Sequence, residues 1–267
     1  MRGRVLIVAG SDSSGGAGIQ ADIKTVTALG GYAATAITAL TAQNTKGVLA
    51  VMAVPPEFVV RQMEAVLTDI GADCIKTGML HTAETIEAVA AALARSARGI
   101  PLVVDPVMVA KGGAKLLAGA AVDALKRDLA VKATILTPNV PEAEALTGLK
   151  IRDLDDMKHA AEMVHTLGPK AVLLKGGHIA DEVVYDVLAT ADGVEVYEHP
   201  WIETPHTHGT GCTLASAIAT GLAQKLTIYE AVVRARAYVL EAIRSAPGLG
   251  RGHGPLNHVH SIHAFER

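Results

Sequence analysis

Five short apolar runs, spaced so that a helix fits between successive runs, constrain the fold more than any other feature of this chain. They are residues 5–9, 74–75, 102–104, 134–136 and 171–174. Their hydrophobicity is uninterrupted, which is typical of strands covered on both faces in a parallel sheet. Residues 56–70, 83–97 and 153–167 show helical periodicity. The alternation predicts an α/β fold with a doubly wound, mostly parallel central sheet and helices on both faces.

Later segments predict one antiparallel element. Residues 183–188 and 194–199 flank a turn that contains Asp192 and Gly193, a pattern typical of a β-hairpin. No linker-like segment, internal repeat or low-complexity stretch interrupts the chain, and 50% of its residues are hydrophobic. We therefore expect residues 1–267 to form a single domain with one sizeable core.

Charge and cysteine content narrow the function classes. The net charge is −3 with no basic stripe, which argues against a nucleic-acid partner. The apolar part of the N-terminal segment is too short for a signal peptide, and no apolar run has the length of a membrane span. Cys74 and Cys212 lie far apart without metal-ligand spacing, as in proteins of a reducing cytoplasm. We expect a cytoplasmic protein that acts on a small molecule.

Small and polar residues follow every one of the five apolar runs. The sequences are GSD (10–12), KTG (76–78), DP (105–106), TPN (137–139) and KGG (175–177). Ligands of open α/β sheets bind beyond the carboxyl ends of the strands. The sequence therefore predicts a binding site along this edge.

The sequence THGTGC (207–212) runs directly into a helix-like stretch. Free amides and the helix dipole at such a terminus attract anions, and glycines let the backbone approach them closely. Taken alone, a glycine-rich turn with a buried cysteine is the commoner explanation, and phosphate binding beside a thiol is the functional one. A hydrolase dyad of Cys212 and His208 lacks an evident third, orienting residue.

Four other features each have a structural and a functional explanation. The loop SSGGAG (13–18) matches neither a dinucleotide fingerprint nor a P-loop, and is either a plain turn or a close backbone approach to a small ligand. Asn139 and Glu142 form a capping-box pattern, but a carboxylate and an amide there also suit the waters of Mg²⁺. Lys175 either reaches solvent or meets phosphates. Gln43, placed in a polar loop, is either merely exposed or pairs with an aminopyrimidine edge.

Histidines gather near the C-terminus, at His253, His258, His260 and His263. This spacing can bind a metal, but no acidic residue or cysteine accompanies it in sequence. We expect a solvated tail instead.

Eight motifs in order resemble one family. They are GSDSSGGAGIQAD (10–22), ALTAQNT (39–45), KTGM (76–79), DPVM (105–108), TPNVPEA (137–143), KGGH (175–178), THGTGCT (207–213) and GRGHGP (250–255). The chain is similar, from residue 5 to about residue 260, to the hydroxymethylpyrimidine/phosphomethylpyrimidine kinases of thiamine biosynthesis, which have the ribokinase-like fold. The resemblance implies ATP-dependent phosphorylation of 4-amino-5-hydroxymethyl-2-methylpyrimidine and then of its monophosphate, by a homodimer.

The same resemblance implies roles for individual residues. Gln43 would bind the aminopyrimidine edge, and the ring or its hydroxymethyl arm would be enclosed by Ala17, Asp22, Met79 and Val107. Mg²⁺–ATP would be held by Asp105, Asn139, Glu142 and Lys175, with Asp105 and Glu142 reaching the metal through water. The transferring phosphoryl group would lie against Gly209, Thr210 and Gly211.

Cys212 would stand where most of the superfamily has an aspartate base. Because helix N-termini and nearby positive charge lower a thiol pKa, we expect a lowered pKa for Cys212.

Two other functions remain open. The nearest is a pyridoxal or pyridoxine kinase on the same fold, against which Gln43 and the following Asn-Thr favour the aminopyrimidine. The other is a non-catalytic sensor that binds a pyrimidine or a nucleotide.

Overall fold

A computed structural model describes residues 2–108, 119–177 and 182–262. One nine-stranded sheet has the order β3-β2-β1-β4-β5-β6-β7-β8-β9. Its strands are β1 (Arg4–Asp12), β2 (Tyr32–Asn44), β3 (Gly47–Ala53), β4 (Cys74–Thr77), β5 (Leu102–Val104), β6 (Ile135–Leu136), β7 (Ala171–Leu174), β8 (Val183–Thr190) and β9 (Gly193–Pro200).

The helices are α1 (Gly18–Ala28), α2 (Pro56–Asp69), α3 (Ala83–Ser96), α4 (Gly119–Ala124), α5 (Val140–Thr147), α6 (Leu154–His165), α7 (Thr210–Ala223) and α8 (Ile228–Arg244). A π-helical turn (Leu125–Leu129) and a 3₁₀ turn (Ala130–Lys132) follow α4. None of the described helices has the length and apolar character that a bilayer crossing requires.

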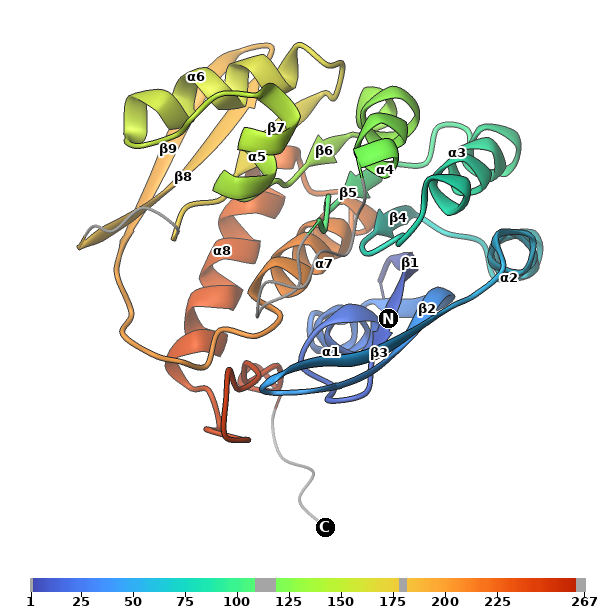
Figure 1. Cartoon of the computed structure of the whole chain (residues 1–267), viewed down its shortest axis with the longest axis horizontal. Coiled ribbons are helices and arrows are strands. Elements are labelled where there is room, and N and C mark those ends of the chain that lie inside the picture. Colours follow the sequence, from blue (N-terminus) through green and yellow to red (C-terminus); the bar gives the residue numbers. More distant parts are fainter. Residues whose placement is uncertain (1, 109–118, 178–181, 263–267) are drawn as a thin grey trace.

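Strand pairing confirms the predicted architecture. Strands β2, β1, β4, β5, β6 and β7 pair in parallel, whereas β3 at one edge and the β8–β9 hairpin at the other are antiparallel. From β1 the chain first builds β2 and β3 on one side, and then returns to build β4 and all later strands on the other (Figure 1). This reversal places a topological switch point between β1 and β4, the usual location of a ligand crevice.

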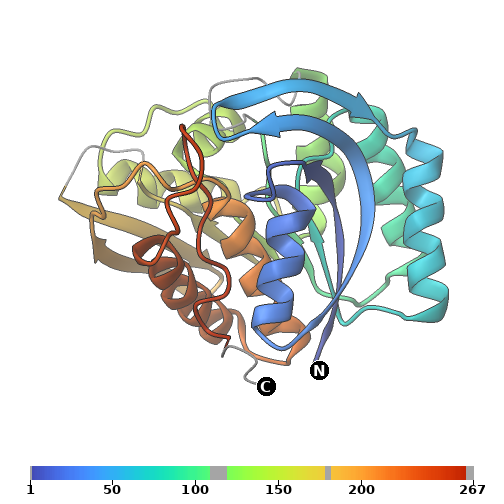
Figure 2. The same ribbon diagram turned by 90° about the horizontal axis from the view of Figure 1, so that it is seen from below.

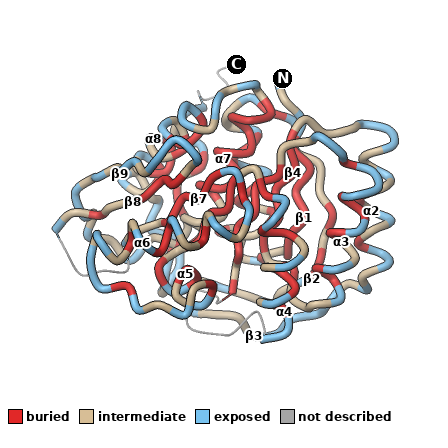
Figure 3. The backbone as a smooth tube through the Cα atoms, turned by 90° about the horizontal axis from the view of Figure 1, so that it is seen from above, coloured by how far each residue is buried: buried red, intermediate tan, exposed pale blue. Residues whose placement is uncertain are grey.

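Two apolar cores lie on opposite faces of the sheet. Leu6 and Val8 of β1 pack into a cluster with residues of α2 to α6, while the alternate residues Val5 and Ile7 pack against α1, α7 and α8. Period-two alternation along the strand explains this division. Both faces of β1 are therefore buried, as its uninterrupted apolar run predicts. Figure 2 shows α1 and α7 along one face of the sheet, and Figure 3 shows the buried residues gathered along the central strands and α7.

The structure corrects the placement of Gln43. We predicted a polar loop, but Gln43 lies near the end of β2 and pairs with Val48 of β3. Both strands were missing from the predicted set. Strand β2 alternates small and hydroxylated residues that are mostly half-buried, and β3 is largely exposed, so neither produces a continuous apolar run.

The expectation of a solvated tail holds at His253, which is exposed, and is wrong at His258 and His260. His258 is buried, and its Nε2 lies 3.0 Å from Thr213 Oγ1 on α7. Leu256 is also buried, and the His260 ring packs against Tyr238 with the two ring planes tilted by 41°. No group of three metal-ligating side chains occurs within residues 2–108, 119–177 and 182–262. His263, and His178 of the KGGH motif, lie outside the described residues.

Candidate functional site

A cavity of about 610 Å³ lies at the carboxyl ends of the parallel strands, next to the start of α7. Its walls include the strand-end segments that the sequence singled out. Of the predicted site residues, the cavity brings together Ala17, Gln43, Met79, Asp105, Val107, Asn139, Glu142, Lys175, Gly209, Thr210, Gly211 and Cys212. Only Asp22 of that set does not line it.

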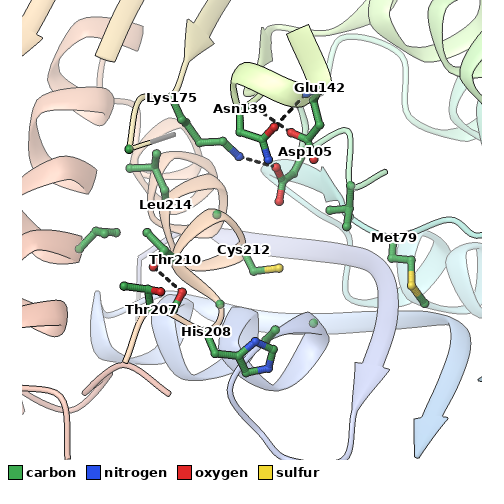
Figure 4. Close-up of a pocket in the computed structure, with 18 of the residues that line it drawn as sticks. Met79, Asp105, Asn139, Glu142, Lys175, Thr207, His208, Thr210, Cys212 and Leu214 are labelled. Atoms are coloured by element: carbon green, nitrogen blue, oxygen red, sulfur yellow. Dashed lines mark hydrogen bonds and ion pairs between the residues drawn. The ribbon is translucent and has the colours of Figure 1, made fainter. Parts of the chain in front are cut away.

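One wall carries a lysine beside a carboxylate, with a second carboxylate farther along (Figure 4). Lys175 Nζ lies 3.0 Å from Asp105 Oδ1, and both side chains are almost fully buried. Asn139 and Glu142 form the predicted capping box: the Glu142 amide donates to Asn139 Oδ1 at 2.9 Å, and the Asn139 amide donates to Glu142 Oε2 at 2.8 Å. The structural explanation of this motif is thus confirmed, and the same two side chains also face the cavity.

Burial dominates the electrostatics of this wall. It raises the pKa of Glu142 to about 7; Lys175 opposes that rise and Asp105 adds to it. Burial alone would lower the pKa of Lys175, but Asp105 and Glu142 together raise it. Lys175 therefore remains a cation at neutral pH, positioned to attract an anionic ligand.

A glycine turn at the N-terminus of α7 forms the facing wall. Gly209 has φ +85°, and a Cβ there would collide with the carbonyl oxygen of Gly16. A Cβ on Gly211 would come within 3.1 Å of Lys175 Nζ. In the described part of the chain, no acceptor outside α7 takes a hydrogen bond from the amides of Gly211 or Cys212. Since first-turn amides also lack partners inside the helix, these groups are free to bind an anion.

The expected lowering of the Cys212 pKa is wrong. Burial raises the pKa of this thiol to about 12, and Asp22 and Asp105 add to the rise, while Lys76 only partly opposes it. The helix terminus does not compensate for desolvation of the thiolate. At neutral pH, Cys212 is a thiol in this structure.

Asp22 lies beneath the cavity, on the buried side of α1. Its carboxylate accepts hydrogen bonds from Lys76 Nζ at 2.9 Å and from Ser216 Oγ at 2.6 Å, and it is fully buried. Lys76 does line the cavity and was not among the predicted site residues. Burial opposes its charge, but Asp22, Cys212 and Asp105 raise the Lys76 pKa above the ordinary lysine value. The sequence signal for it was its position at a strand end, in KTG.

A second polar cluster was also missed. His208 Nε2 lies 2.8 Å from Asp12 Oδ2 and 3.4 Å from Gln43 Nε2, and Asp12 and His208 are both buried. Burial alone would raise the Asp12 pKa, but hydrogen bonds from His208, Ser14 and the Ala17 amide lower it to about 2. Both residues stand in motifs that we quoted, yet 196 positions separate them, so only the fold shows that they touch.

Sequence comparisons agree with this geometry. The family described as phosphomethylpyrimidine kinase matches residues 12–257. A Geobacter sulfurreducens thiamine biosynthesis bifunctional protein is 55% identical over 97% of this chain, although the chain spans only 52% of that relative. A Bacillus subtilis hydroxymethylpyrimidine/phosphomethylpyrimidine kinase is 46% identical, with 99% of this chain and 96% of the relative covered.

Solved structures add two close neighbours. The ADP complex of a Bacillus subtilis pyridoxal kinase superposes with a TM-score of 0.90 at 37% identity, covering 97% of this chain and 98% of that one. A phosphomethylpyrimidine kinase from Clostridium difficile has a TM-score of 0.80 at 45% identity, covering 90% of this chain and 99% of that one. The resemblance stated from the motifs is thereby confirmed: this chain belongs to the phosphomethylpyrimidine kinase family.

Proposed function

We propose that this chain is an ATP-dependent kinase of thiamine biosynthesis. Its acceptors would be the hydroxymethyl group of 4-amino-5-hydroxymethyl-2-methylpyrimidine and then the phosphate of the monophosphate formed. One observation carries the proposal beyond family membership: the free amides at the start of α7, the Lys175 ammonium and the Asp105 carboxylate converge in a single cavity. That combination suits a phosphoryl group in transit between two oxygens.

Positioning and charge neutralisation account for most of phosphoryl transfer. The amides of Gly211 and Cys212 would bind the oxygens of the transferring group, and Lys175 would supply a full positive charge beside them. Because Gly211 has no side chain, the phosphate can approach both the helix terminus and Lys175. Each of these groups acts from a fixed position, which is what stabilises charge that develops in the transition state.

The donor set also suits Mg²⁺. Two carboxylates and one amide face the cavity, from Asp105, Glu142 and Asn139. Mg²⁺ prefers oxygen ligands, keeps several waters and needs only one or two protein carboxylates. Asp105 and Glu142 would hold the ion, largely through water, and the ion would neutralise part of the phosphate charge. The raised pKa of Glu142, about 7, means that a bound cation would also favour its ionised form.

At the other end of the cavity, Gln43, Ala17, Met79 and Val107 would enclose the pyrimidine. We propose that Asp22 acts through Lys76, which it pairs with, rather than by touching the substrate. Cys212 would accept the hydroxyl proton. Since its pKa is about 12, that role requires the thiol first to release its own proton to water, so that the thiolate takes the hydroxyl proton.

An ADP-release assay with Mg²⁺–ATP tests the proposal. The acceptors are the pyrimidine alcohol, its monophosphate, pyridoxine and pyridoxal. We expect ADP release with both pyrimidines. Release with pyridoxal alone would favour the second candidate, a pyridoxal kinase, which the TM-score of 0.90 to such an enzyme keeps in consideration. Nucleotide binding without any ADP release would instead identify a non-catalytic sensor.

The proposal has three further parts. They are a single domain over residues 1–267, expected from the absence of a linker, a homodimer, implied by the family resemblance, and a cytoplasmic location, expected from the two separated cysteines. One sheet that contains every described strand supports the first. Size-exclusion chromatography with light scattering tests the second, and fractionation of the cells that produce the protein tests the third.

A further inference from the structure

The orientation of the Gln43 side-chain amide is decided by its neighbours. The Gln43 backbone is pinned, because Ser13 Oγ donates to the Gln43 carbonyl at 2.9 Å and accepts from its amide at 2.8 Å. Only the side chain is left to adjust. Its two ends, an oxygen acceptor and a nitrogen donor, are similar in size, so hydrogen-bond partners determine which end lies where.

One neighbour is His208, on the loop before α7 (Figure 4). Its Nε2 lies 2.8 Å from Asp12 Oδ2, and both Asp12 oxygens already accept hydrogen bonds, from the Ser14 and Ala17 amides at 2.8 Å each. With a pKa of about 2, Asp12 is ionised and can only accept. His208 Nε2 must therefore carry a hydrogen, whichever charge state the ring has. That hydrogen belongs to the shorter bond with Asp12, so toward Gln43, 3.4 Å away, Nε2 offers no lone pair and cannot accept a hydrogen bond from the Gln43 amide nitrogen.

The other neighbour is Thr41. Its Oγ1 lies 2.9 Å from the Ser11 carbonyl oxygen and 3.2 Å from Gln43 Oε1. A carbonyl only accepts, so the single Thr41 hydroxyl hydrogen belongs to the shorter bond with Ser11. Toward Gln43, Thr41 therefore presents a lone pair. The structure places the Gln43 nitrogen toward His208 and its oxygen toward Thr41. Because His208 offers no acceptor on one side and Thr41 offers a lone pair on the other, the exchanged orientation fits both neighbours better, with the oxygen toward His208 and the nitrogen toward Thr41.

We propose that His208 and Thr41 hold the Gln43 amide in that one orientation and so decide which ring edge the cavity accepts. The inference rests on the proposed function. Gln43 lines the cavity and retains one oxygen lone pair and one N–H for a ligand. A ring held there must place a donor on the His208 side and an acceptor on the Thr41 side.

A 4-aminopyrimidine offers such an edge, with its amino group as donor and the adjacent ring nitrogen as acceptor. The matching 4-oxo compound reverses both groups, with a carbonyl acceptor beside a ring N–H donor. The ring cannot turn over to compensate, because its hydroxymethyl arm must point to the amides at the start of α7. An amide free to rotate would accept both compounds, whereas a held amide accepts only the first. His208 and Thr41 are thus positioning residues that act through Gln43.

The test measures kcat/KM for 4-amino-5-hydroxymethyl-2-methylpyrimidine and for its 4-oxo analogue. The variants are His208→Phe and Thr41→Val, which each remove one hydrogen-bonding group, and His208→Gln and Thr41→Ser, which restore it. We expect the wild type to favour the amino compound by about 100-fold or more. His208→Phe and Thr41→Val should each reduce that ratio by about tenfold or more, and the two conservative variants should recover most of it.

The ratio separates a positioning role from a structural one, because general damage to the site lowers kcat/KM for both compounds alike. Gln43→Leu serves as the reference that abolishes discrimination. An unchanged ratio in both His208→Phe and Thr41→Val, with discrimination lost in Gln43→Leu, would overturn this inference and leave the proposed function intact. If the wild type phosphorylates neither pyrimidine, the proposed function itself fails. Should His208→Phe not fold, the Thr41→Val and Thr41→Ser pair decides.

Discussion

The two cysteines have different surroundings, so substituting each in turn tests whether Cys212 is the general base. Cys212 lines the cavity, whereas Cys74 is buried in the sheet and does not line it. If Cys212 accepts the hydroxyl proton, Cys212→Ala should lower kcat by about 10²–10⁴-fold, the usual contribution of a general base. Cys74→Ala is the matched control and should keep the wild-type kcat. A loss below about tenfold in Cys212→Ala, with its thermal unfolding unchanged, would limit the thiol to packing.

Glu142 should make stability fall as the pH rises. Its folded pKa is about 7, above the ordinary value of 4.5, so between these two values the folded protein holds a proton that the unfolded chain releases. Stability is therefore highest below pH 4.5 for this group and decreases by up to about 3 kcal/mol as the pH passes 7. Glu142→Gln keeps an oxygen for the capping box and should flatten the slope of urea midpoint against pH in this window.

The pKa of Glu144, two residues away on α5, is shifted in the opposite direction. A hydrogen bond from the Ile151 amide lowers its pKa, so its stabilisation is present above pH 4.5 and is lost as the pH falls. Glu144→Gln should therefore lower the urea midpoint at neutral pH and leave the Glu142 slope in place. Identical pH profiles for wild type and Glu142→Gln would contradict a raised pKa at position 142.

Interactions between residues close in sequence could be predicted, whereas the burial of a side chain could not. The capping box of Asn139 and Glu142 is a four-residue pattern, so the sequence contains all of it. The Cys212 pKa depends on carboxylates at positions 22 and 105 and on how the fold covers the thiol, which is why the predicted direction was wrong. The contact between Asp12 and His208 joins residues 196 positions apart and has no sequence signal of its own.

In the first turn of helix α7, we expect one substitution to lower activity without lowering stability. Gly211 has room for a Cβ except toward Lys175 Nζ, and alanine is a better helix former than glycine by up to about 1 kcal/mol. Gly211→Ala should therefore unfold at the same or a slightly higher urea concentration, while kcat/KM for Mg²⁺–ATP falls at least about tenfold because the methyl group occupies the phosphate position.

Gly209→Ala provides the contrast on the same turn. Its positive φ and the nearby Gly16 carbonyl mean that this substitution should lower both stability and activity. Full activity in Gly211→Ala would show that phosphate does not bind against this helix terminus.

Some strands of the sheet could be predicted from the sequence and others could not. The five strands buried on both faces were predicted because covering both faces demands a continuous apolar run, and the predicted hairpin became β8 and β9. Strand β3 forms the edge of the sheet and is largely exposed, and β2 beside it is mostly half-buried, so Gly47–Ala53 and Tyr32–Asn44 lacked that signal. Because β2 was not predicted, Gln43 was assigned to a loop.

For the whole molecule, the switch point between β1 and β4 explains why distant motifs converge. The loop after β1, the end of β4 and the start of α7 all reach the same cavity. The GRGHGP segment (250–255) contacts the turn after β2 and the loop before α7: the His253 amide donates to the Thr45 carbonyl at 2.8 Å, and the His208 amide donates to the Gly254 carbonyl at 3.1 Å. Binding in this cavity therefore connects elements from both halves of the chain.

Nucleotide should consequently stabilise the entire fold. A ligand that binds only the folded state at 100 times its Kd adds about 2.7 kcal/mol, which for a chain of this size corresponds to a rise in Tm of roughly 5–10 °C. We expect Mg²⁺–ADP to produce such a shift in a thermal unfolding assay, and Lys175→Ala to lose most of it because the phosphates lose their nearest full charge. Lys158→Ala is the control: Lys158 pairs with Asp155 on the exposed surface of α6, so its variant should keep the wild-type shift. Equal shifts in all three proteins would mean that the nucleotide phosphates bind away from Lys175, and the assignment of this cavity to the transferring group would then fail.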